Sequence, residues 1–171
     1  EIILNLWEVK NVIFVCLGNI CRSPLAEALF RHKVNNLGIE SQFQIDSCGT
    51  NGFHNGEKAD YRTRANAEEH GINVTSISRQ LTLGDIMDAD YVITMANDVH
   101  QHVLNFCRNQ EQKDKIHLFR KFDPKEPNAD VPDPWYNDRF EDVFQIINTN
   151  CDLWIDFLVP GSKSQVSSHH D

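Results

Sequence analysis

The chain has 171 residues, 40% of them hydrophobic, which is enough for one domain with a buried core. Sixteen basic and twenty-five acidic residues give a net charge of −9, which argues against nucleic acid and anionic membranes as partners. No segment approaches the roughly 18 consecutive apolar residues of a membrane span. Five cysteines without a disulfide-framework spacing, and no leader-like pattern in residues 1–7, predict a cytoplasmic protein.

The predicted elements alternate between short apolar runs and helical patterns. Strands are expected at residues 12–15, 43–47, 91–94 and 116–118, and helices at 24–36, 61–70, about 98–107, and from about 138 onward. Apolar side chains recur every three or four residues in the last helix, so Cys151 and Trp154 are expected in the core. This alternation predicts an α/β fold, a single domain with a central parallel four-stranded sheet and helices on both faces.

The junction between the first strand and the first helix has the features of a nucleophilic, anion-binding site. Cys16 ends the strand, a tight loop follows, and Ser23 and Pro24 are expected to be the cap and first residue of the helix. Such a loop gathers backbone N–H groups into a nest for an anion. The spacing Cys-x5-Arg lets the Arg22 guanidinium hold two phosphate oxygens above the Cys16 sulfur, to which Ser23 is placed to donate.

Other interpretations of this loop are weaker. A lone cysteine at the end of a strand is usually a small buried apolar residue, and Cys-x5-Arg occurs often by chance. The phosphate loop of nucleotide hydrolases is excluded because no Gly-Lys-Ser/Thr follows. A zinc site is disfavoured because no downstream Cys/His pair completes a ligand set with Cys16 and Cys21.

A second chemical centre is expected in the long loop at residues 122–137. Departure of a phenolate is faster when an acid protonates it, and the same carboxylate can then activate water. On spacing alone Asp123, Asp130 and Asp133 are equal candidates, and an Asp-Pro pair is also common in ordinary turns.

Residues 15–24, from Val15 to Pro24, resemble the phosphate loop of the low-molecular-weight protein tyrosine phosphatase family almost letter for letter. The Asp-Pro-aromatic loop of that family appears at residues 133–136, and the segments 47–50, 53–56 and 78–81 are similar to further family landmarks in the same order. The resemblance covers about residues 10–158, the expected phosphatase domain. Residues 1–9 are then an N-terminal extension, and 159–171, rich in serine and histidine, are expected to be a disordered tail.

The resemblance implies hydrolysis of phosphotyrosine in proteins, and of small aryl phosphates, through a phosphocysteine intermediate, with no cofactor and no metal. It makes Cys16 the nucleophile, Arg22 the phosphate clamp and Asp133 the acid and later the base. It places Leu17, Gly18, Asn19, Ile20, Cys21 and Ser23 in the phosphate-binding loop, and Phe53, Trp135 and Tyr136 around the substrate ring.

By the same resemblance, the Asn19 side chain ties the loop to Ser47, which leaves Gly18 and Asn19 free to take positive φ. Cys21 is close enough to Cys16 to trap it as a disulfide on oxidation, although it is equally well explained as an inert neighbour. The sequence makes no prediction about the oligomeric state.

The chain departs from the family pattern at two positions. Ala96 follows Met95 where relatives commonly carry Asp, which removes a polar contact near the pocket, and Phe53 stands where many relatives have Trp.

Three rival functions are disfavoured by single features. A thiol-dependent arsenate reductase on the same fold needs two further cysteines before the third strand, and residues 80–91 contain none. A protein arginine phosphatase carries Thr at the position of Ile20, whose apolar side chain favours an aryl ester. A catalytically silent phosphotyrosine-binding module would lack the cysteine or the acid, whereas both Cys16 and Asp133 are present.

Overall fold

The computed structural model describes residues 8–161. Four strands, β1 (Lys10–Cys16), β2 (Phe43–Gly49), β3 (Tyr91–Thr94) and β4 (Ile116–Leu118), form one parallel sheet in the order β2-β1-β3-β4. The central pairing sets Val15 opposite Cys48 on one side and Thr94 on the other. All four predicted strands and the parallel sheet are therefore confirmed.

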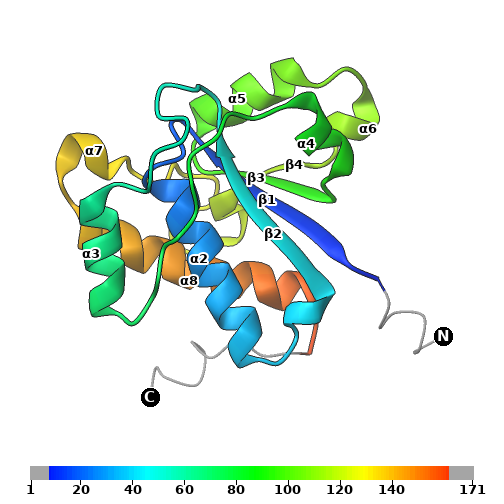
Figure 1. The fold of residues 1–171 in the computed structure, drawn as a ribbon. Helices are drawn as coiled ribbons and strands as arrows, with labels where there is room; N and C mark the ends of the chain where they lie inside the picture. The colour runs from blue at the N-terminus through cyan, green and yellow to red at the C-terminus, as the bar shows by residue number, and fades with distance from the viewer. Residues whose placement is uncertain (1–7, 162–171) are drawn as a thin grey trace.

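Helices cover both faces of the sheet (Figure 1). Alternate β1 side chains point to opposite faces. Phe14 packs in the core that includes residues of α2 (Arg22–Asn36) and α8 (Phe140–Leu158), whereas Val15 packs in the core that includes residues of α4 (Leu83–Asp88) and α5 (Asn97–Phe106). Cys151 and Trp154 of α8 are fully buried, as expected. The predicted α/β architecture is confirmed.

The first helix begins earlier than predicted. Helix α2 starts at Arg22 with Cys21 as its N-cap, and the cap makes no side-chain hydrogen bond. Ser23 is therefore not the cap and Pro24 is not the first helical residue. The Ser23 hydroxyl instead lies 3.0 Å from the sulfur of Cys16, because the two buried side chains are neighbours in the structure.

Several short elements were not predicted because they have too few residues to show a period. These are α4, α6 (Gln110–Lys113), α7 (Pro134–Asn137) and the 3-10 turns η1 (Glu40–Gln42) and η2 (Phe119–Phe122). Helix α3 (Tyr61–Glu69) ends one residue before the predicted end, and α8 begins at Phe140 because Asp138 takes a left-handed conformation, φ 61°, that separates it from α7.

The expected N-terminal extension and C-terminal tail lie mostly outside the described residues. Within residues 8–161, no helix is both long enough and apolar enough to cross a lipid bilayer. The strand order places the carboxyl end of β1, at Cys16, between two neighbouring strands. Crevices at this end of parallel sheets are the usual place for ligands.

Candidate active site

The Cys16 thiol lies at the end of β1, where it is 3% exposed. Its sulfur accepts the Asn19 N–H at 3.3 Å and is 3.0 Å from the Ser23 hydroxyl. The hydroxyl also lies 3.3 Å from the carbonyl oxygen of Cys48, so it can donate to the sulfur or to that oxygen. A charged acceptor makes stronger hydrogen bonds than a neutral one.

The loop at residues 17–21 directs the Asn19 N–H at the sulfur and leaves other backbone N–H groups without an acceptor in the described part of the chain. The amides of Gly18, Ile20 and Cys21 have no acceptor among residues 8–161. Asn19 has positive φ, 58°, whereas Gly18 does not, so that half of the backbone expectation is wrong. Gly18 instead packs closely, because a Cβ there would lie 3.1 Å from the His54 ring, and the ring would have to shift slightly to admit it. The unpaired amides form a cradle suited to an anion.

The side chain of Asn19 locks this loop to its surroundings. Its amide nitrogen donates to Ser23 at 2.8 Å and to Ser47 at 3.0 Å, and its oxygen accepts the Arg79 N–H at 3.0 Å. The end of β2 also packs tightly on the loop, since a Cβ at Gly49 would lie 2.8 Å from the Leu17 carbonyl oxygen. The Asn19–Ser47 contact implied by the family resemblance is present.

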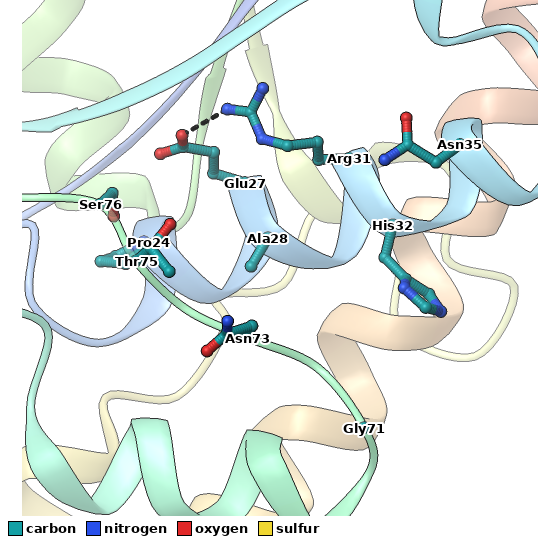
Figure 2. Close-up of a pocket in the computed structure, with 10 residues that line it drawn as sticks. All are labelled: Pro24, Glu27, Ala28, Arg31, His32, Asn35, Gly71, Asn73, Thr75 and Ser76. Carbon is teal, nitrogen blue, oxygen red and sulfur yellow. Dashed lines mark hydrogen bonds and ion pairs between the residues drawn. The ribbon is translucent and has the colours of Figure 1, made fainter.

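Glu27 extends the same network away from the loop. It is a buried carboxylate that accepts from the Ser47 hydroxyl at 2.6 Å and from Arg31, one turn further along α2, at 2.6 Å. Figure 2 shows the Glu27–Arg31 pair on the wall of a polar groove between α2 and the segment containing residues 71–76. Cys16 does not line this groove, so Glu27 contributes to the site as a support for Ser47.

Arg22 and Asp133 bring two distant parts of the chain together. The Arg22 guanidinium donates to the Val131 carbonyl at 3.0 Å, and it lies 3.5 Å from Asp133. The Val131 N–H in turn donates to the Met95 carbonyl at the end of β3 at 2.8 Å. These bonds fix the middle of the acid loop, by which we mean residues 123–139, over the cradle of backbone amides.

The three aspartates that spacing left equal have different surroundings. Asp123 is buried, pairs with Arg120 at 2.9 Å and accepts from Asn150 at 3.1 Å. Burial alone would raise the pKa of Asp123, but hydrogen bonds from Asn150, two backbone amides and Arg120 lower it to about 2. Asp130 accepts from Asn97, and Asp133 lines the same cavity as Cys16.

That cavity measures about 220 Å³ and has aromatic walls. Cys16, Arg22 and the loop residues form its floor, and its rim carries Phe53, which is 83% exposed, with Trp135 and Tyr136. Four of the predicted loop residues line this cavity together with the three predicted aromatic residues; they are Leu17, Gly18, Ile20 and Cys21. Burial raises the pKa of the Cys21 thiol to about 12. In the described part of the chain, no cluster of three His, Cys, Asp or Glu side chains could hold a metal ion.

Two cavity residues were missed in the sequence. His54 and Asn51 line the cavity, and His54 packs 6.1 Å from the Trp135 ring while its Nδ1 bonds Glu57 at 3.0 Å. The local signals for His54 were its position beside Phe53 and its place in the segment 53–56, which resembles a family landmark.

Asp130 binds the start of α5 next to the departure at Ala96. Ala96 is the N-cap of α5 and its side chain cannot cap the helix. Asp130 of the acid loop accepts the Asn97 N–H at 2.7 Å. This contact holds the acid loop to the first turn of α5, which follows β3 in the chain.

Comparison with known proteins identifies the family. The family model described as low molecular weight phosphotyrosine protein phosphatase matches residues 11–164. The human protein of that name is 41% identical over 140 residues, covering 80% of this chain and 87% of the human one. Low molecular weight protein-tyrosine-phosphatase YfkJ of Bacillus subtilis is 38% identical over 145 residues, covering 83% and 91%.

Solved structures agree with the sequence relatives. A crystal structure of protein tyrosine phosphatase from Entamoeba histolytica, described as a product state mimic, has a TM-score of 0.83 and 36% identity, covering 89% of this chain and 97% of that one. The chain belongs to the low molecular weight phosphotyrosine protein phosphatase family.

Proposed function

We propose that this protein hydrolyses phosphotyrosine in proteins, and small aryl phosphates, through a phosphocysteine intermediate on Cys16. The observation that carries the proposal is the composition of one cavity. A sulfur that accepts a backbone N–H and lies 3.0 Å from a hydroxyl is found beside unpaired backbone amides, an arginine and a carboxylate, under a rim of aromatic side chains. A planar phosphorylated ring fits between such aromatic walls, with its phosphate at the floor.

In the first step, the Cys16 thiolate attacks phosphorus in line with the aryl oxygen. An S–P bond forms, the P–O bond to the ring breaks, and Asp133 gives its proton to the departing oxygen. Arg22 and the loop amides hold the equatorial phosphate oxygens, on which negative charge is spread in a loose transition state. Positioning and charge stabilisation are the protein's main contributions.

In the second step, water attacks the phosphocysteine. The Asp133 carboxylate takes a proton from the water, the S–P bond breaks, and inorganic phosphate leaves as the Cys16 thiolate is regenerated. The Ser23 hydroxyl, 3.0 Å from the sulfur, stabilises the thiolate as a leaving group. The enzyme then returns to its starting state, with Asp133 protonated again.

A trapping experiment tests this mechanism. Protein mixed with ³²P-labelled phosphotyrosine peptide and denatured within milliseconds should carry label on Cys16. The Cys16→Ser variant should not turn over in the steady state, because an alcohol is far less ionised than a thiolate at neutral pH. Cys21→Ser is the matched control in the same loop and should still be labelled on Cys16. Label at a residue other than Cys16 in the parent protein, or steady-state turnover by Cys16→Ser, would overturn the nucleophile assignment.

We further propose that the substrates are phosphotyrosine proteins of the cytoplasm. All five cysteines are free thiols, which suits a reducing compartment. A net charge of −9 disfavours binding to nucleic acid or anionic membranes in bulk, so the phosphate is captured locally by Arg22 and the loop amides. The expected phosphatase domain at residues 10–158 contains every residue used in this mechanism.

A further inference from the structure

Arg62 lies between the phosphate loop and the acid loop without lining the cavity. It is in the first turn of α3, and its side chain is one-third exposed. None of the motifs in the sequence singles it out. Its contacts nevertheless reach both halves of the site, and they account for how the acid loop is held.

On one side, Arg62 is anchored through Asp60. The Asp60 carboxylate accepts Nε of Arg62 at 3.1 Å and a terminal nitrogen at 2.9 Å, and it also caps α3 by accepting the Arg62 N–H at 2.8 Å. The Asp60 N–H donates to the carbonyl of Ile20, within the phosphate loop, at 2.8 Å. A bidentate pair of this kind fixes the plane of the guanidinium relative to that loop.

On the other side, the guanidinium faces the acid loop. Its central carbon lies 5.4 Å from the Trp135 ring centre and 4.8 Å from that of Phe140, and a terminal nitrogen lies 3.6 Å from the Asp138 carboxylate. These contacts involve α7, the single turn that follows Asp133, and the residues just after it. A planar cation that stacks on rings and forks to carboxylates suits this place, whereas a lysine ammonium would make only one of these contacts well.

The position of α7 controls the carboxyl group of Asp133. One Asp133 oxygen accepts the Trp135 N–H at 3.0 Å, and the other lies 3.5 Å from Arg22. If Trp135 moves, the Asp133 carboxyl must turn or lose its bond. We propose that Arg62 is a positioning residue that holds the acid loop so that the Asp133 proton faces the leaving oxygen. The proposal rests on the proposed function of Asp133 as general acid.

The test measures kcat/KM for aryl phosphates whose leaving phenols differ in pKa, because this constant covers the steps up to cleavage of the aryl-oxygen bond. Arg62→Met should lower kcat/KM for phenyl phosphate by about 10- to 100-fold, the size expected from a misplaced acid. The loss for p-nitrophenyl phosphate should be about threefold or less, because its leaving oxygen needs little protonation. Arg62→Lys should behave like Arg62→Met.

Two controls separate positioning from general damage. Arg139→Met removes a cation from the end of the same loop, where the side chain is mostly exposed and pairs with Asp142, and should leave the leaving-group dependence unchanged. The ratio of the two substrates within one sample does not depend on how much protein is folded. In an Asp133→Ala background, Arg62→Met should cause no further loss, since the group that it positions is absent.

The outcomes distinguish the proposed role of Arg62 from the proposed role of Asp133 as general acid, on which it rests. A uniform loss across the leaving groups in Arg62→Met, or a full additional loss in the Asp133→Ala background, would overturn the role of Arg62. If Asp133→Ala itself lost activity equally with every leaving group, the assignment of Asp133 as general acid would fall, and the role of Arg62 with it.

Discussion

Replacing Asn19 by alanine should destabilise the protein strongly, although the side chain never contacts the reacting atoms in the proposed mechanism. Asn19 is 1% exposed and its side chain makes three hydrogen bonds, to Ser23, Ser47 and the Arg79 backbone. At about 0.5 to 1.5 kcal/mol each, their loss amounts to about 1.5 to 4.5 kcal/mol. Alanine also tolerates φ 58° less well than asparagine, which adds about 1 kcal/mol.

The free energy of unfolding of Asn19→Ala should therefore fall by about 2.5 to 5.5 kcal/mol. With a urea m value of about 2 kcal/mol/M, the unfolding midpoint moves down by about 1.2 to 2.8 M. Asn19→Gly loses the same hydrogen bonds but accepts positive φ, so it should be less damaged than Asn19→Ala by about 1 kcal/mol. Asn36→Ala, on the exposed face of α2, is the control and should stay within about 0.5 kcal/mol of the parent.

Two results would refute this reasoning. A loss below about 1 kcal/mol in Asn19→Ala would mean that the three bonds contribute little beyond those that water supplies in the unfolded chain. Equal stability of the alanine and glycine variants would mean that the left-handed backbone at this position carries no strain.

Arg22→Lys should lose kcat almost as completely as Arg22→Ala in an aryl phosphate assay, because a point charge cannot grip two oxygens at once; retention of most of kcat by the lysine variant would contradict this role. Mild peroxide should inactivate the enzyme reversibly if the buried Cys21 thiol traps oxidised Cys16 as a disulfide with loss of water, and Cys21→Ser should then recover less activity on addition of thiol. Unchanged recovery would assign Cys21 a packing role. Ile20→Thr should shift kcat/KM toward phosphoarginine relative to phosphotyrosine by about 10- to 200-fold, the usual effect of one pocket contact, and a parent enzyme that already prefers phosphoarginine would overturn the tyrosine preference. The free energy of unfolding should fall as pH drops from about 5 to 2, because the pKa of the Asp123 carboxyl is lowered to about 2 in the folded protein. The Asp123 carboxylate stabilises the fold fully above its unfolded-state pKa, and this contribution is lost as the carboxyl is protonated. The pH slope of the unfolding free energy should therefore be smaller in Asp123→Asn.

The sequence alone predicted the sheet, the main helices and the cysteine loop, because each of these depends on local order in the chain. Buried parallel strands have continuous apolar runs, and a long helix repeats its apolar face every three or four residues. Cys16 and Arg22 lie within seven consecutive residues, so their meeting needs only one loop. The four-residue helices left no such pattern and were missed.

Contacts between distant segments were decided only by the tertiary structure. Asp133 is 111 residues from Arg22, and spacing could not separate it from Asp123 or Asp130. The separation comes from packing: Arg120 and Asn150 bury one carboxylate, Asn97 binds the second, and the third is left in the cavity. Ser23 likewise fits the sequence pattern of a helix cap, but in the structure its hydroxyl lies 3.0 Å from the buried Cys16 sulfur. Arg62 had no sequence signal, because its proposed role depends on the acid loop lying against the first turn of α3. A local sequence pattern carries no information about which distant segment will pack against a given residue.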